Sequence, residues 1–139
     1  MLGVRGKGEA CFEDTRVRIT WCIGHLAELE DPAHYDAAWK KWSFETLPMI
    51  PERFALRLRG EGDVKAHFAA LKRHLRDKTV TEVVNACDAG REGELIFRYV
   101  YELAGCNRPI VRLWTSSLTD EAIGDAWARL RPGADFDAL

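Results

Sequence analysis

The sequence has little of what marks secreted, membrane-spanning or zinc-binding proteins. No apolar run approaches the roughly 20 residues that a transmembrane helix needs. Charged residues interrupt the first 18 positions, where a signal peptide would carry an apolar run. The four cysteines are scattered without a CxxC spacing, which disfavours a zinc site and favours reduced, mostly buried thiols. We therefore expect a cytoplasmic protein that does not contact a membrane.

The chain also lacks a strong charge of either sign. It has 20 lysines and arginines against 22 aspartates and glutamates, so the formal net charge is −2. Bulk electrostatics therefore do not favour binding to nucleic acid, and any nucleic-acid surface must be a local patch. With 139 residues, 47% of them hydrophobic and 30% charged, the chain fits one soluble domain with its own core.

The later half of the chain alternates helix-like and strand-like patterns. Such alternation predicts an α/β fold, in which helices flank a parallel sheet through right-handed crossovers. On the helix after the third predicted strand, the expected apolar face is Leu95, Ile96, Tyr99, Val100 and Leu103. The patterns predict strands over 79–86 and 109–114, and helices from about 63, over 91–104 and from about 120 to Pro132-Gly133.

The first half is less regular. Alternating apolar residues predict strands over 17–21 and 54–59. Between these strands, residues 31–52 contain three prolines and no sustained period. We interpret this segment as an irregular excursion with a short helical piece over 35–40.

A short acidic loop carries most of the functional information. The run Asp88-Ala89-Gly90-Arg91-Glu92-Gly93-Glu94 directly follows a predicted strand and opens a predicted helix. Sites in open α/β sheets lie at the carboxyl ends of strands. Several carboxylates close together suit Mg²⁺, which prefers oxygen ligands and keeps several waters. We predict Asp88 and Glu92 as its ligands; the structural alternative is a helix cap and a first-turn acid.

The same loop begins a series of blocks that resembles a known family. DAGREGE, LIFRYVYELAGC and RLWTSSLTDEAI are similar to the Toprim domain of type IA DNA topoisomerases, nearest to the topoisomerase III members. TWCIGHL at 20–26 and LPMIPE at 47–52 resemble the same family. The resemblance runs from about Gly8 to the end. It implies a Rossmann-like Toprim fold and an Mg²⁺-dependent enzyme that cuts and rejoins single-stranded DNA.

One position departs from the family pattern. The usual acidic triad is Asp-x-Asp-x-Glu, and here Asp88, Gly90 and Glu92 occupy its places. The middle acid is therefore absent, and we expect a lower affinity for the metal because one charge is missing. Glu94 is a candidate second acid that orients Arg91 or a metal-bound water, and a solvated first-turn glutamate is the alternative.

Further side chains are candidates for contacts with DNA phosphates. His25 resembles a family position that follows a strand near the active face, although a lone histidine is more often structural. Arg91 is a candidate to contact a DNA phosphate or to hold the acids in place, with a structural salt bridge as its alternative role. Arg112 is placed to reach the DNA backbone. Residues that follow the strand at 109–114 combine helix capping with possible phosphate binding; they are Ser116, Ser117 and Thr119.

The resemblance also implies parts that this sequence does not match. The family carries a catalytic glutamate in a Glu-Lys-Pro-Ser-like motif on a first strand, and a nucleophilic tyrosine in a later domain. Tyr35, Tyr99 and Tyr101 do not fit that tyrosine motif. We therefore expect residues 1–139 to form an incomplete, N-terminally truncated Toprim domain that does not cleave DNA alone. A sheet edge left uncovered would favour a homodimer.

The expected partners are single-stranded DNA and the remaining topoisomerase domains, on a bacterial nucleoid or plasmid. Two alternatives stay open. One is a degenerate, non-catalytic Toprim module that binds DNA or a protein. The other is a Toprim-type nuclease or primase, which uses the same acidic loop but fits the upstream blocks poorly.

Overall fold

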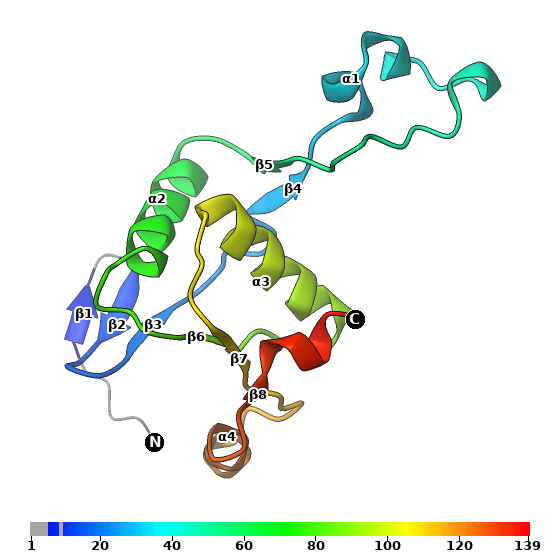
Figure 1. Cartoon of the computed structure of the whole chain (residues 1–139). Coiled ribbons are helices and arrows are strands. Elements are labelled where there is room, and N and C mark those ends of the chain that lie inside the picture. The colour runs from blue at the N-terminus through cyan, green and yellow to red at the C-terminus, as the bar shows by residue number, and fades with distance from the viewer. Residues whose placement is uncertain (1–5, 9) are drawn as a thin grey trace.

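The computed structural model describes residues 6–8 and 10–139 of the chain (Figure 1). A body of helices and small sheets carries an arm, residues 31–54, that extends away from it on one side. Over these described residues, the body combines one parallel strand pair with several antiparallel pairs. The expected α/β class is therefore confirmed, in a mixed rather than a wholly parallel form.

The parallel pair and its crossover helix carry the acidic loop. β6 (Val83–Asn85) and β7 (Ile110–Arg112) run parallel, and α3 (Arg91–Ala104) lies between them in the chain. The helix ends at Gly105, whose φ of 65° lies in the left-handed region that glycine adopts most easily. The predicted order of strand, helix and strand is confirmed here.

The buried face of α3 differs from the predicted one. Leu95 is 39% exposed, and of the predicted apolar face only Val100 is fully buried. The face of the helix that packs against the body instead includes an acid and two small residues. The small residues let the helix backbone come close to the body. Hydrophobic periodicity does not reveal such a face. The buried residues of α3 are Gly93, Glu94, Phe97, Val100 and Ala104.

The C-terminal segment also corrects a sequence expectation. The last helix, α4 (Asp120–Trp127), stops before the predicted end at Pro132-Gly133. Arg131–Pro132 instead form β8, which pairs antiparallel with β7 as an edge strand. An edge tolerates proline because the missing N–H faces no further strand. A 3-10 helix, η3 (Gly133–Phe136), follows β8.

The N-terminal half builds two small antiparallel sheets. β1 (Gly6–Gly8), β2 (Cys11–Glu13) and β3 (Arg18–Thr20) form a meander. β4 (Ala27–Leu29) pairs with β5 (Leu56–Leu58) at the base of the arm. The strands predicted over 17–21 and 54–59 are confirmed as β3 and β5.

The arm leaves β4 and returns to β5 as a chain of short helical turns. Its elements are α1 (Pro32–Tyr35), η1 (Ala37–Lys40) and η2 (Phe44–Thr46), and none of them contains a buried residue. The Tyr35 hydroxyl anchors the base, because it accepts a hydrogen bond from the Ala55 N–H at 2.7 Å. We expected one short helical piece over 35–40 in this segment, and the structure instead has three short helical turns.

Large apolar side chains of the arm lie on its surface. Trp42 is 79% exposed and Phe44 is 97% exposed, and three more follow before β5. Exposed apolar side chains grouped in this way mark interaction surfaces more often than scattered ones do. The others are Leu47, Ile50 and Phe54.

The core of the body lies between two helices and the base of the arm. α2 (Asp63–Leu75) contributes Phe68 and Leu71, and α3 contributes Val100 and Ala104, which pack with Leu26. In the part of the chain that the structure describes, no helix is both long and apolar enough to cross a membrane.

Candidate metal-binding loop

The acidic loop starts at the carboxyl end of β6 and leads into α3. The loop backbone lies very close to the first turn of this helix. A Cβ atom on Gly93 would lie 2.1 Å from the Asp88 carbonyl oxygen and 2.8 Å from the Asp88 nitrogen. Such contacts are impossible for a real side chain, so glycine is required where the first turn of α3 meets the loop.

The two predicted metal ligands are both accessible. Asp88 and Glu92 are exposed, one on the loop and one in the first turn of α3. Oxygen donors of this kind suit Mg²⁺, which binds through one or two carboxylates and completes its shell with water and phosphate. Over the described residues, however, no three His, Cys, Asp or Glu side chains are grouped closely enough to hold a metal ion. The donor set thus fits a sparsely ligated Mg²⁺ and not a fully enclosed ion.

His25 meets the loop from a distant part of the chain. Its Nε2 lies within hydrogen-bonding distance of Glu92 Oε1, although 67 residues separate the two. The imidazole is 31% exposed and the Glu92 side chain 70% exposed, so the pair lies at the surface. The structure therefore places His25 beside the acidic loop, with a carboxylate as its partner.

Arg112 is not at the surface. Its side chain has no exposed area, and its guanidinium points back under the acidic loop. Nη1 donates to the carbonyl oxygens of Cys87 at 2.7 Å and Asn85 at 2.9 Å, and Nη2 donates to that of Asp88 at 2.7 Å. We expected Arg112 to reach the DNA backbone. The structure does not support that role, because the side chain is enclosed by the protein.

Glu94 is buried beside this arginine. Only 5% of the residue is exposed, and its Oε2 lies 3.1 Å from Arg112 Nε. Oε2 also accepts a hydrogen bond from Asn85 Nδ2 at 2.9 Å, and Oε1 accepts one from Arg98 Nε at 2.7 Å. Glu94 therefore orients Arg112, Arg98 and Asn85, whereas we expected it to orient Arg91 or a metal-bound water.

The ion pair between Arg112 and Glu94 stabilises charged forms that burial disfavours. Burial lowers the pKa of Arg112, and the negative charge of Glu94 acts in the opposite direction. The guanidinium also lies over the Trp114 ring, 5.0 Å from its centroid, in a cation–π contact. Burial likewise raises the pKa of the Cys87 thiol, so Cys87 stays protonated at neutral pH. The loop therefore rests on a charged but compensated interior.

Sequence reasoning missed Asn85 and Arg98. Arg98 links Glu94 to the C-terminal segment, because its Nη2 donates to the Gly133 carbonyl at 2.9 Å and pairs with Asp137 at 2.8 Å. The spacing of Glu94 and Arg98, four residues apart on a helix, was a visible signal. A polar residue, Asn85, at the end of a buried strand was another.

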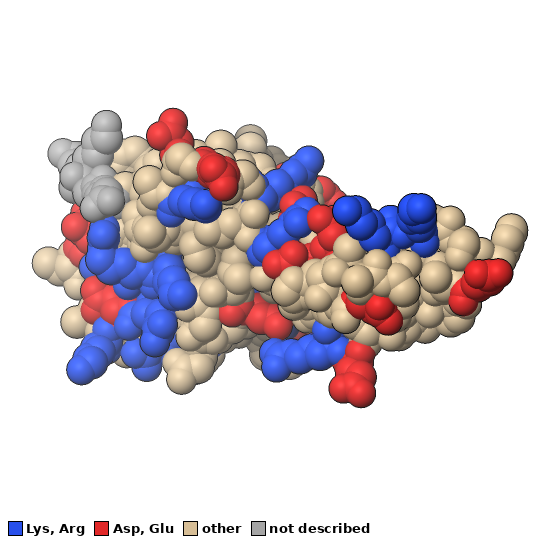
Figure 2. All heavy atoms as spheres, turned by 90° about the horizontal axis from the view of Figure 1, so that it is seen from above, with Lys and Arg blue, Asp and Glu red and all other residues tan. Residues whose placement is uncertain are grey.

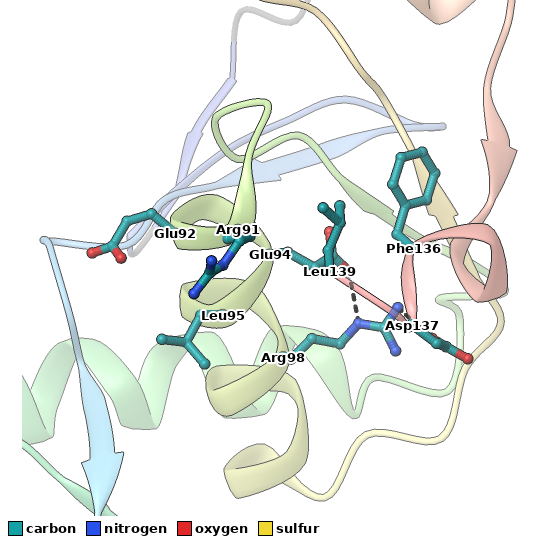
Figure 3. Close-up of a pocket in the computed structure, with 8 residues that line it drawn as sticks. All are labelled: Arg91, Glu92, Glu94, Leu95, Arg98, Phe136, Asp137 and Leu139. Carbon is teal, nitrogen blue, oxygen red and sulfur yellow. Dashed lines mark hydrogen bonds and ion pairs between the residues drawn. The ribbon is translucent and has the colours of Figure 1, made fainter.

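A depression of about 670 Å³ lies next to the loop (Figure 3). Arg91, Glu92 and Arg98 line it from α3, and Phe136 and Asp137 line it from the C-terminal segment. Glu92 extends away from those C-terminal residues (Figure 3). Of the two predicted metal ligands, only Glu92 is among the residues that line it. The depression is therefore a neighbour of the predicted metal site and does not enclose it.

The serine and threonine cluster forms a helix cap. Thr119 Oγ1 accepts a hydrogen bond from the Ala122 N–H at 3.3 Å, which caps α4. Ser117 Oγ lies 3.4 Å from the same oxygen, and Ser116 is exposed. Helix capping and phosphate binding remain compatible roles for this cluster, because the capping hydrogen bond is made by Thr119 and does not involve Ser116.

The charge on the surface is mixed. Figure 2 shows lysine and arginine side chains gathered toward one end of this face of the molecule, and acids among bases elsewhere on it. The last turn of α2 carries three basic residues, Lys72, Arg73 and His74. A basic surface is thus local, as the net charge of −2 requires.

The sequence is similar to a known domain family and to curated proteins. The model of the Toprim domain family matches residues 5–118. The chain is 46% identical over 133 residues to DNA topoisomerase 3 of Bacillus anthracis, with 96% of this chain and 18% of that protein covered. It is 42% identical over 139 residues to DNA topoisomerase 3 of Shouchella clausii, with 100% of this chain and 19% of that protein covered.

The DNA topoisomerase 3 of Staphylococcus haemolyticus is 38% identical over 138 residues, which cover 99% of this chain and 19% of that protein. The chain thus spans about a fifth of the length of the curated relatives it matches. The family match extends over most of the sequence and includes the loop from Asp88 to Glu94. The resemblance seen in the sequence is confirmed, and this chain belongs to the Toprim domain family.

Proposed function

We propose that this chain acts as the Mg²⁺-binding Toprim part of a topoisomerase III-like enzyme that cleaves and rejoins single-stranded DNA. One observation carries the proposal: two exposed carboxylates, Asp88 and Glu92, lie on a glycine-rich loop at the carboxyl end of a parallel strand. The membership of the Toprim family and the names of the relatives support it.

Asp88 and Glu92 would hold the metal, and bound Mg²⁺ would supply positive charge beside the scissile phosphate. His25 holds the Glu92 carboxylate in a fixed direction. Arg91 is exposed in the first turn of α3 and is the cation of the loop that is free to approach DNA. Beyond the metal, phosphate contacts would come from the segment that precedes α4, at Ser116, Ser117 and Thr119.

By itself the chain is not expected to cut DNA. Two of its tyrosines already bond within the domain: the Tyr35 hydroxyl bonds Ala55, and that of Tyr101 donates to the Arg108 carbonyl at 2.6 Å. Tyr99 lies on α3, in the wrong sequence context for the family's nucleophile. We propose that the nucleophile comes from another domain, as the greater length of the relatives allows.

The arm is proposed to face the remaining topoisomerase domains. Its exposed side chains include aliphatic ones, Leu47 and Ile50, which pack against protein but do not stack on bases. A homodimer is the competing arrangement, because β6 ends its sheet and pairs, over the described residues, with β7 alone. Light scattering during size-exclusion chromatography decides between them, and a clean monomer counts against the dimer. Such an enzyme would act in the cytoplasm, on the nucleoid or a plasmid.

The direct test is a Mg²⁺ titration followed by NMR. Wild-type protein is compared with Asp88→Ala and Glu92→Ala, and with Glu102→Ala as a matched control, since Glu102 is an exposed acid at the other end of α3. We expect saturable shifts in the loop for the wild type and the control, and their loss in both loop variants. A response that survives both loop substitutions would refute the assignment.

One observation favours a second function, a binding module that uses no metal. The Glu92 carboxylate already has His25 as a partner, and the middle acid of the family pattern is absent. A module of this kind would shift a single-stranded oligonucleotide in a gel equally well with Mg²⁺ and with EDTA. Metal-dependent nicking of a plasmid by the chain alone would instead favour the nuclease alternative.

A further inference from the structure

The loop that carries Asp88 has no regular secondary structure between the end of β6 and the start of α3. Its conformation must therefore depend on contacts with other parts of the molecule, since no helix or strand hydrogen bonds hold it. The close approach of Gly93 to Asp88 fixes the distance between the loop and α3. It constrains only the side of the loop that faces this helix.

On the other side, the loop rests on the guanidinium of Arg112. This group donates to the carbonyl oxygens of Cys87 and Asp88, which are consecutive loop residues, and to that of Asn85, where β6 ends. A planar guanidinium directs several N–H groups in fixed directions, which an ammonium group does not. The orientation of the peptide groups at 87 and 88 therefore follows from the position of Arg112.

Arg112 is itself held from three directions. It is the last residue of β7 and pairs with Asn85, so the parallel strand next to β6 sets its backbone position. Glu94 supplies the opposite charge at 3.1 Å, and Trp114 lies against the face of the guanidinium. Removal of the acid would leave a buried cation without a partner, which is strongly unfavourable.

We propose that Arg112, held by Glu94, is a positioning residue that sets the direction of the Asp88 carboxylate by fixing the carbonyl groups of the loop. The proposal rests on the proposed function for the part that concerns Mg²⁺. The effect on the loop itself is independent of any metal.

The test compares Arg112→Lys with Arg98→Lys. Lysine keeps the charge in both, but only Arg112 binds the loop, whereas Arg98 binds Glu94, Gly133 and Asp137. Amide hydrogen exchange is measured without metal at residues 86–92 and, as an internal reference, at Ala70 and Leu71 in the core helix α2.

For Arg112→Lys we expect exchange in the loop to rise by about tenfold or more, as the loss of one or two hydrogen bonds implies, while α2 keeps its protection. Arg98→Lys should leave the loop as in the wild type. Equal effects of the two variants on the loop, or an equal rise in the loop and in α2, would overturn the proposal, since a merely structural arginine predicts that result.

A second variant covers failure of Arg112→Lys to fold. Glu94→Gln keeps the shape of the side chain and removes its charge, so we expect the same local pattern with a smaller rise. The Mg²⁺ affinity of each folded variant is then measured by NMR. If the wild type binds Mg²⁺ and Arg112→Lys binds it equally well, positioning fails; if the wild type binds none, the proposed function fails and the exchange data alone decide the positioning role.

Discussion

The arm and the acidic-loop region place polar and apolar groups in opposite ways. The arm turns Trp42 and Phe44 outward and buries no residue of its helical turns. The loop region turns Arg112 and Glu94 inward and leaves Asp88 at the surface. Apolar groups outside and charges inside are both unfavourable unless something compensates them.

The compensation is visible for the loop, and for the arm we propose that it comes from the remaining topoisomerase domains. Each buried charge of the loop region has an opposite charge or a carbonyl group next to it. The apolar side chains of the arm have no such cover in the described structure. A site must be rigid before its ligand arrives, whereas a docking surface gains its partner contacts only on assembly.

The largest expected effect is at Glu94. Glu94→Ala should lower the free energy of unfolding by about 3–5 kcal/mol, because it leaves buried Arg112 without its partner. Urea denaturation measures the change. Glu102→Ala is the control on the same helix and should cost no more than about 0.5 kcal/mol, since Glu102 is exposed. Equal losses in the free energy of unfolding for the two variants would show that the buried Glu94–Arg112 pair contributes no more stability than an exposed acid does.

Gly93 gives the next largest effect. Gly93→Ala should destabilise the protein by about 1–3 kcal/mol, because its methyl group would overlap the Asp88 carbonyl. Gly124, in α4, has no atom within 4 Å of an added Cβ, so Gly124→Ala should stabilise by up to about 1 kcal/mol. Thermal unfolding of both variants checks the opposite signs, and the same sign for both would contradict the close packing of loop and helix.

A surface carboxylate tests whether burial is what makes the loop pair strong. The Thr79 N–H and hydroxyl donate to Asp77, and together with Arg18 they lower its pKa to about 2. The folded-state pKa lies below the unfolded value of 3.8. Its stabilisation is therefore present above about pH 4 and is lost as the pH falls toward 2.

Asp77→Asn should consequently lower the melting temperature modestly at pH 6, and this difference should shrink as the pH falls from 4 to 2. Melting curves of wild type and variant across that range give the measurement. A difference that stays constant with pH would show that the charge of Asp77 is not the source of its effect.

The smallest effect is expected in the arm. Phe44→Ser should change the free energy of unfolding by no more than about 0.5 kcal/mol, because Phe44 is 97% exposed. Phe68→Ala, in the core, should cost about 3–5 kcal/mol. Chemical denaturation of both variants tests the contrast. A large loss at Phe44 would mean that the arm is part of the domain's own core.

The sequence predicted the loop region best where the information is local. The strand before Asp88, the helix that starts at Arg91 and its end at Gly105 all follow from neighbouring residues. The predicted end of the last helix was wrong, because Arg131–Pro132 pair with β7 instead. A strand partner that lies 19 to 21 residues away in the chain leaves no mark on the local pattern.

The same limit explains the site. The order of residues was sufficient to assign the family and to point to Asp88 and Glu92, since a contiguous motif carries both. It was not sufficient to place Arg112 under the loop or His25 beside Glu92, because those contacts join segments 24 and 67 residues apart. Burial converts an arginine from a surface cation into an internal support, and burial is a property of the packed molecule alone.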